Sequence, residues 1–239
     1  MTFRPTLWAT VAAAVVLAVL VGLGNWQLDR RSWKKELLET RARQIDTPAM
    51  SYAAVVAAAH PALEAVEYRP IRLRGRYRPA NTAKLLSRTR DGRAGFHLIT
   101  PLEENTAGVV VLVDRGWVPV GSTAEITPAP AGLVSIEGYV RKFETPGRFT
   151  PDNEPETGAW FYLDREQMAS AMDLAVVAPF YVQRAPSTTL SGGYPAGGVP
   201  DIALRNPHLQ YAITWYALAL VLLVIYVIFH ARRRVGEDE

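Results

Sequence analysis

Two long runs without a formally charged side chain lie near the ends of the chain. One covers residues 5–28 and is 24 residues long, and the other covers residues 206–231 and is 26 residues long. Each exceeds the roughly 20 apolar residues that a helix needs to cross a bilayer core. The pattern therefore predicts a membrane protein with two transmembrane helices, at 7–25 and 207–230, which flank one large domain.

The first run is interpreted as a retained anchor rather than a cleaved signal peptide. Its apolar stretch, Leu7–Gly24, is longer than the apolar region of a signal peptide, and no small-x-small cleavage pattern follows it. Six residues precede it, so we expect no mitochondrial transit sequence. We therefore expect the chain to reside in a bacterial inner (plasma) membrane.

Basic residues give two conflicting indications of orientation. Three arginines at 232–234 follow the second run and indicate a cytoplasmic C-terminus, whereas six basic residues within 30–43 would keep the central segment inside. Long loops translocate largely regardless of charge, so we give the second run more weight. We expect a cytoplasmic stub at 1–6, a periplasmic domain at 26–206 and a cytoplasmic tail at 231–239.

The segment after the first run keeps a helical pattern although it is rich in charge. Trp26, Arg30, Trp33 and Leu37 fall at i, i+4, i+7 and i+11, which places them on one stripe of a helix. We expect a helical stem over 24–44, whose basic side chains rest on anionic headgroups. A docking surface for a membrane partner is the alternative.

From residue 68 onward, apolar and polar residues alternate with a period of two. In 68–77, Ile71 and Leu73 alternate with arginines, which is typical of a strand with one wet face. Further short runs predict strands at 83–88, 96–102, 109–120, 133–143 and 179–185. This pattern predicts a β-rich α+β extracytoplasmic domain, folded as a small antiparallel barrel.

Two other segments interrupt the strands. A helix is predicted over 164–172, where Asp164 caps the helix and Gln167 returns the bond. Residues 185–201 are rich in Gly, Pro and Ser, so we expect a poorly structured link into the second apolar run.

Composition removes several classes of chemistry. The chain contains no cysteine, which excludes disulfides, thiolate nucleophiles and iron–sulfur clusters. Its net charge of +3 is too small to favour nucleic acid. No Gly-rich phosphate loop, paired-His metal motif or nucleophile elbow is present.

Most of the remaining candidates are expected to be structural. In 114–119 we expect a salt bridge between Asp114 and the next residue, Arg115, and a buried indole at Trp117. Residues 160–164 are expected to supply core side chains and a helix cap. Three of the four histidines have no special context. We expect His60 at the surface, His97 on the wet face of a strand and His230 at the membrane interface.

His208 has a more informative context. Asn is a favoured helix cap and Pro is favoured at the first helical position, so Asn206 and Pro207 predict that His208 lies in the first turn of the second span. The positive end of the helix dipole disfavours imidazolium, which leaves a neutral ring able to bind a metal. The free amides of this turn are suited to carboxylates.

The residues that follow His208 complete a candidate binding face. Tyr211, Ala212 and Trp215 lie at +3, +4 and +7, with a small residue between two aromatic ones. A flat ligand with acidic groups at the surface and an apolar tail in lipid would suit this face. The alternative is that His208 is an interfacial residue and that the aromatic side chains form an ordinary interfacial belt.

Four segments together resemble the surfeit locus protein one family of cytochrome c oxidase assembly factors. They are GNWQLDRRSWK (24–34), VDRGWVP (113–119), NEPETGAWFYLD (153–164) and NPHLQYAITWY (206–216). The last of these is the most specific, and all four occur in the order that the family has. One departure is Tyr216, where the family usually has Phe.

The resemblance implies a two-span protein with its large domain outside the cytoplasm. It implies that the protein is not an enzyme and that it aids insertion of heme a into cytochrome c oxidase subunit I, with heme a synthase and the lipid bilayer as further partners. In bacterial members the His at the start of the second span is the expected axial ligand of the heme iron. That position is His208 here, with Tyr211 and Trp215 as candidate cofactor-binding neighbours.

Three other functions remain open. A ligand-free membrane scaffold could hold oxidase subunits during assembly, and the colour of the purified protein would distinguish it. A heme-modifying enzyme is disfavoured because neither span offers a second suitable histidine. A tethered periplasmic binding module would require a formed pocket in the central domain.

Overall fold

The computed structural model describes residues 5–123, 126–186, 193–202 and 206–231. These residues form two compact units, which are described separately. The first unit comprises residues 1–40 and 202–239, and the second comprises residues 41–201. The arginines at 232–234, on which the expected orientation depends, lie outside the described residues.

The first unit is built from two apolar helices. Helix α1 spans Leu7–Ile45, and its residues up to Thr40 belong to this unit; helix α4 spans His208–Ala231. Both are long and apolar enough to cross a membrane, and few of the residues in their apolar windows are buried. A core helix of a soluble protein would cover such side chains, so the exposure of these two helices is consistent with a membrane protein.

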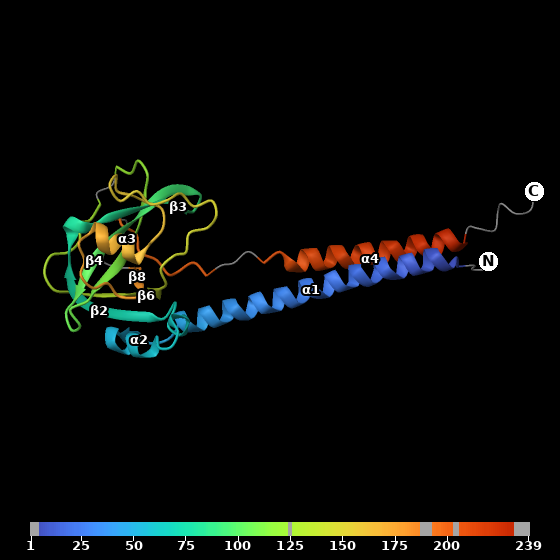
Figure 1. The fold of residues 1–239 in the computed structure, drawn as a ribbon, viewed down its shortest axis with the longest axis horizontal. Coiled ribbons are helices and arrows are strands. Elements are labelled where there is room, and N and C mark those ends of the chain that lie inside the picture. Colours follow the sequence, from blue (N-terminus) through green and yellow to red (C-terminus); the bar gives the residue numbers. More distant parts are fainter. Residues whose placement is uncertain (1–4, 124–125, 187–192, 203–205, 232–239) are drawn as a thin grey trace, which may run out of the picture. The chain divides into compact units, whose positions relative to one another are not determined.

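The two helices lie side by side and run in opposite directions (Figure 1). Hydrogen bonds join Thr6 to His230 and Thr10 to Tyr226 near one end of the pair. Others join residues near the opposite end, as described below. We call the line of contact between α1 and α4 the seam. The buried residues on the two helices are small or hydrogen-bonded: Gly24, Ala212, Ala219 and His230.

Helix α1 continues well past the apolar run, as the sequence predicted. Its 39 residues extend without a break through the charged segment that follows Gln27. On this stretch the guanidinium of Arg30 lies 4.4 Å from the ring centroid of Trp33, which is a cation–π contact along the predicted stripe. The stem is therefore helical, and its contact with headgroups or with a partner remains an interpretation.

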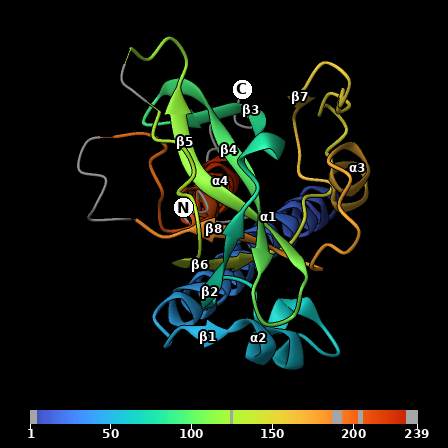
Figure 2. The ribbon, with the colours of Figure 1, turned by 90° about the vertical axis from the view of Figure 1, so that its left-hand side faces the viewer.

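The second unit contains the β-rich domain (Figure 2). Its strands are β1 (Met50–Ser51), β2 (Pro70–Tyr77), β3 (Ala83–Arg90), β4 (Arg93–Glu104), β5 (Val110–Pro119), β6 (Val134–Arg141), β7 (Ala159–Trp160) and β8 (Tyr181–Arg184). Each of the six runs that the sequence predicted as strands forms a strand in the structure. The two-residue strands β1 and β7 were not predicted, because two residues are too few to show alternation.

The sheet order is β1-β2-β6-β8-β5-β4-β3-β7, and β2 also pairs with β4. The pairings therefore follow a circuit through β2, β6, β8, β5 and β4 and return to β2. The sheet is mixed rather than purely antiparallel, because β1–β2, β3–β7 and β5–β8 are parallel pairs.

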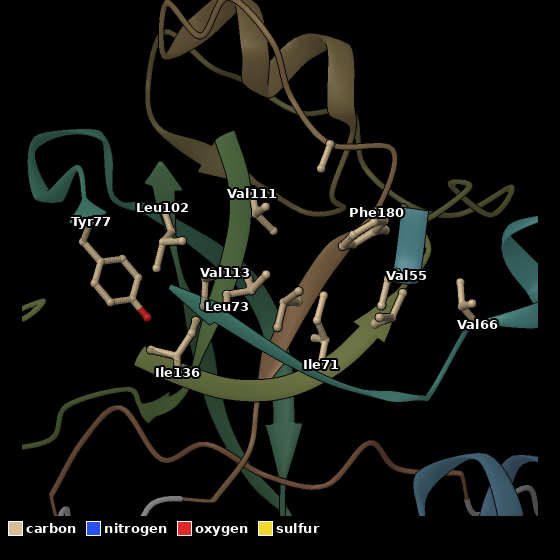
Figure 3. Packing of buried hydrophobic residues seen from close by; sticks show 13 residues of the cluster. Val55, Val66, Ile71, Leu73, Tyr77, Leu102, Val111, Val113, Ile136 and Phe180 are labelled. Carbon is tan, nitrogen blue, oxygen red and sulfur yellow. The ribbon is translucent and has the colours of Figure 1, made fainter. Parts of the chain in front are cut away.

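Two groups of buried side chains explain why the first part of β5, residues 110–113, is buried on both faces. Val111 and Val113 join a cluster with residues of other circuit strands, including Leu73, Leu102 and Ile136 (Figure 3). The alternate side chains of β5, Val110 and Leu112, point to the opposite face and join a second cluster, which includes residues of β3, β7 and α3. A strand covered on both faces reads as a continuous apolar run rather than as an alternation.

Short helices complete this unit. Helix α3 (Arg165–Ala171) is capped by Asp164, whose carboxylate accepts hydrogen bonds from the backbone N–H groups of Glu166 and Gln167. The predicted return bond is absent, because the Gln167 side chain contacts Asn153 and Tyr162 instead. Helix α2 (Tyr52–Ala58) and two single-turn 3-10 helices, η1 (Leu63–Ala65) and η2 (Pro79–Asn81), were not predicted.

The described part of the link at 185–201 is more ordered than the composition indicated. Ala196 pairs with Trp117 through two backbone hydrogen bonds, and the Tyr194 ring meets the Trp117 ring edge-on, with centroids 6.2 Å apart. The backbone of Ala196 therefore satisfies both of its polar groups against β5 instead of water. Residues 187–192 of the link lie outside the described residues.

Candidate functional site

His208 is the first residue of helix α4, so it lies in the first turn as predicted. The hydrogen bond from the Tyr211 N–H to the Pro207 carbonyl, 3.3 Å, opens the helix one residue later than the sequence suggested. Asn206 does not cap it. Its Nδ2 lies 3.5 Å from the carbonyl oxygen of Arg31, and its buried Oδ1 has no partner among the described residues.

The imidazole of His208 is held from the opposite helix. Its Nδ1 lies 2.7 Å from Oε1 of Gln27 on α1, and both side chains are half-buried. A carbonyl oxygen only accepts, so Nδ1 carries the proton and donates it to Gln27. In the neutral ring, Nε2 then bears the lone pair. No partner for Nε2 is found within the described part of the chain.

A second polar contact fixes the seam two helical turns further along α4. The hydroxyl of Tyr216 donates to Oδ1 of Asn25 at 2.7 Å, and the Tyr216 ring lies directly on Gly24. A Cβ on Gly24 would come within 2.6 Å of Cε1 of Tyr216. Glycine is therefore required for this close approach, and Tyr216 uses a hydroxyl that Phe would lack.

The predicted binding face is divided by the seam. Ala212 is 1% exposed, so it is covered and unavailable to a ligand. Tyr211 is 54% exposed and Trp215 is half-buried, and their positions at +3 and +7 place them on the same stripe of α4 as His208. The candidate site is therefore the flank formed by His208, Tyr211 and Trp215, without Ala212.

The histidine at the other end of α4 differs from its sequence interpretation. His230 was expected at the membrane interface, but it is 1% exposed within the seam. Its Nδ1 donates to the Tyr226 carbonyl at 2.9 Å, and its Nε2 is 3.2 Å from the Thr6 hydroxyl, which donates to it. Both ring nitrogens are engaged, so this ring offers no lone pair to a metal.

The histidine on β4 is also more constrained than the sequence indicated. His97 was expected on a wet face, but its side chain is 25% exposed and its Nδ1 lies 2.7 Å from Oδ2 of Asp114 on β5. Asp114 is buried and accepts a second hydrogen bond from the Gly116 N–H. The pair joins β4 to β5 where a bulge shifts their register.

The salt bridge expected between Asp114 and Arg115 is replaced by this contact. Arg115 donates instead to the carbonyl of Thr127 at 2.8 Å, and burial lowers the pKa of its guanidinium. Trp117 is buried as predicted. His97 and Asp114 also line a polar cavity of about 320 Å³ on the β domain, which the sequence did not reveal because its residues come from separate strands.

Burial raises the pKa of tyrosine side chains in the core of the β domain. It raises the pKa of Tyr77, which arginines at 184 and 115 partly offset, and it raises the pKa of Tyr181 further. Desolvation disfavours the phenolate, so both side chains stay neutral in the folded domain. These groups belong to the core rather than to a reactive site.

The donor set at the start of α4 is one imidazole rather than a group of metal ligands. No group of three or more His, Asp or Glu side chains gathers within the described residues, so a free cation would find too few ligands. A porphyrin supplies four nitrogen ligands itself and requires only an axial donor. A single imidazole with a free Nε2 beside exposed aromatic surface fits this requirement.

Comparisons with known proteins match most of the chain. The SURF1 family model matches residues 14–220, which include α1 beyond its first turns, the whole β domain and the first half of α4. The chain is 33% identical to a SURF1-like protein of Caenorhabditis briggsae over 232 residues, covering 88% of this chain and 71% of the relative.

Vertebrate proteins match to a similar extent. Surfeit locus protein 1 of Mus musculus is 32% identical over 221 residues, covering 85% of this chain and 70% of the relative. Surfeit locus protein 1 of Homo sapiens is 34% identical over 218 residues, covering 83% and 69%. Because the match runs through both apolar helices and the domain between them, the chain belongs to the SURF1 family.

Proposed function

We propose that this protein is an assembly factor for cytochrome c oxidase, which binds heme a and aids its insertion into subunit I of the oxidase. The observation that carries the proposal is the free Nε2 of His208, oriented by Gln27 at the start of α4. Family membership supports the assembly role, and the site geometry supports the ligand.

In this proposal His208 holds the heme iron through Nε2, and Tyr211 and Trp215 contact the macrocycle. The heme is cargo, and its iron supplies the acceptor for the imidazole lone pair. The exposed apolar surface of α4 below Tyr211, including Ile213 and Leu220, suits a long hydrocarbon tail. The free backbone amides of the first turn suit carboxylates such as the heme propionates.

Reversible binding follows from the small number of contacts. One axial ligand and one partly exposed flank enclose much less of the ligand than a buried cofactor pocket does. We therefore propose a chaperone that releases its cargo rather than an enzyme that changes it. Heme a synthase is the proposed donor, because it produces the ligand that this site would receive.

The proposed location is a bacterial inner membrane, with α1 and α4 crossing the bilayer and the β domain in the periplasm. The exposure of the apolar side chains on both helices supports the membrane location. We interpret the five-strand circuit of the β domain as a small barrel that contributes contacts to oxidase subunits rather than to heme.

The test is an absorption spectrum of the detergent-purified full-length protein from a host that produces heme a. We expect the His208→Ala variant to lose nearly all of the heme signal and to remain in the membrane fraction. His60→Ala is the matched control, because His60 is exposed and belongs to the other unit, and it should keep the wild-type spectrum.

Two results would contradict the proposal. Unchanged heme content in His208→Ala would remove the ligand assignment. A colourless wild-type protein from a host with a working heme a pathway would favour the ligand-free scaffold that holds oxidase subunits during assembly.

A further inference from the structure

We propose that Gln27 is a positioning residue that fixes the tautomer of His208 and thereby presents Nε2 to a metal. The inference rests on the proposed function for the identity of the metal, heme iron. It adds a role for a residue on the other helix, which does not itself contact the ligand.

The contact has a defined direction. Gln27 Oε1 lies 2.7 Å from Nδ1 of His208, and the residues are 181 positions apart in the sequence. The carbonyl side of the amide faces the ring, so the neutral imidazole is protonated at Nδ1. Without an acceptor at this point, the proton is free to occupy Nε2, which would then have no lone pair for a metal.

The position of Gln27 is itself secured. Asn25, two residues earlier on α1, accepts the hydrogen bond of Tyr216, and Gly24 packs against the ring of the same tyrosine. These contacts hold the register of α1 against α4 within two turns of the Gln27–His208 pair. The amide oxygen is therefore held beside the ring by a fixed pair of helices.

The comparison with His230 supports this role. That ring is also protonated at Nδ1, but its Nε2 accepts from the Thr6 hydroxyl, so the lone pair is used within the seam. The His208 ring likewise donates from Nδ1 to a carbonyl oxygen, but no described residue uses the lone pair on its Nε2. Outer partners that orient a ligating imidazole typically change metal affinity by about 10–100-fold when they are removed.

The first experiment reads the tautomer directly and needs no heme. The full-length protein, labelled with ¹⁵N at histidine, is purified in detergent, and long-range ¹H–¹⁵N spectra distinguish rings protonated at Nδ1 from rings protonated at Nε2. His208 is assigned by its loss in His208→Ala. We expect Nδ1 protonation in the wild type and a shift towards Nε2 protonation in Gln27→Met, which keeps the chain length but removes the acceptor.

The second experiment titrates the same proteins with ferric heme a. Gln27→Met should lower the affinity by about 10–100-fold. Gln27→Glu keeps an acceptor oxygen and should bind like the wild type. Gln210→Met is the matched control, because Gln210 is exposed in the first turn of α4 and makes no contact with His208 in the described structure, and it should change neither measurement.

The outcomes separate the two proposals. An unchanged Nδ1-protonated ring in Gln27→Met overturns the positioning role, whatever the heme titration gives. A heme affinity in Gln27→Met equal to that of the wild type also overturns it. Retention of heme by His208→Ala instead overturns the ligand in the proposed function, and the tautomer spectra then decide the role of Gln27 alone.

Discussion

The phenol of Tyr181 illustrates how burial of one polar group affects the whole domain. Its ring packs beside that of Phe143, with centroids 5.9 Å apart, and desolvation raises its pKa above the ordinary value of 10.0. The folded state therefore retains the phenol proton at pH values where the unfolded chain releases it. The resulting stabilisation is complete below about pH 10 and is lost as the pH rises further.

We expect the thermal midpoint of the full-length protein to fall steeply above about pH 10. Tyr181→Phe should make this decline shallower, because one proton fewer separates the folded and unfolded states. Thermal melts of the detergent-purified protein, followed by near-UV circular dichroism at a series of pH values, measure this decline. An identical slope in the variant would show that Tyr181 does not couple folding to pH.

A different residue-scale effect concerns the close approach at Gly24. We expect Gly24→Leu to displace the Tyr216 ring, because a Cβ alone would come within 2.6 Å of it. The displacement should break the bond to Asn25 and weaken heme a binding by shifting Gln27 away from His208. Gly22→Leu is the matched control, because a Cβ there has open space, and it should bind heme a normally.

At the scale of elements, the cap of helix α3 is the best defined local signal. Asp164 accepts from the two N–H groups at the start of the helix, and this helix packs Met168 into the second core cluster. We expect Asp164→Ala to destabilise the β domain by about 1 kcal/mol. Chemical denaturation followed by tryptophan fluorescence measures the loss, and Asp152→Ala, an exposed carboxylate outside the helix, should cost much less.

The pairing of α1 with α4 gives a second prediction at this scale. The chain has no cysteine, so a pair introduced at Thr6 and His230 can be crosslinked selectively by a short bismaleimide. We expect an intramolecular crosslink, because these side chains are 3.2 Å apart. Mass spectrometry of the digested protein detects it.

A control pair at Thr6 and Gln210 tests the direction of the helices. Gln210 lies 20 residues before His230 on α4, which corresponds to about 30 Å along the helix. No crosslink should form there if the helices are antiparallel. Equal crosslinking of both pairs would contradict the seam.

Elements with a strong local pattern could be predicted from the sequence, and those that depend on distant partners could not. Ile71 and Leu73 alternate with arginines because β2 has one exposed face, and the charged stem of α1 keeps its helical stripe. The parallel pairing of β5 with β8 leaves no such signal, because register depends on contacts across the sheet. His208 was found from its helix-start context. Gln27 lies in one of the segments that carry the family resemblance, but nothing in the local sequence indicates its hydrogen bond to a residue 181 positions away.

At the scale of the whole molecule, the orientation of the chain is the main open prediction. If both apolar helices cross the membrane, residues 41–201 lie on one side of it, and we expect that side to be the periplasm. An alkaline phosphatase fused near Val120, which is 69% exposed, should be active. A fluorescent protein that folds only in the cytoplasm should stay dark at the same position, and the reverse pattern would contradict this topology.

The two imidazoles of α4 make the helix pair asymmetric. The ring at one end satisfies both of its nitrogens internally, and the ring at the other end leaves one electron pair available. Under the proposed function, a heme that reaches this pair of helices would find one available imidazole nitrogen among the described residues, at the His208 end. Binding and release of the heme would then occur at the same site. The direction of transfer would therefore depend on the relative heme affinities of the donor and the recipient.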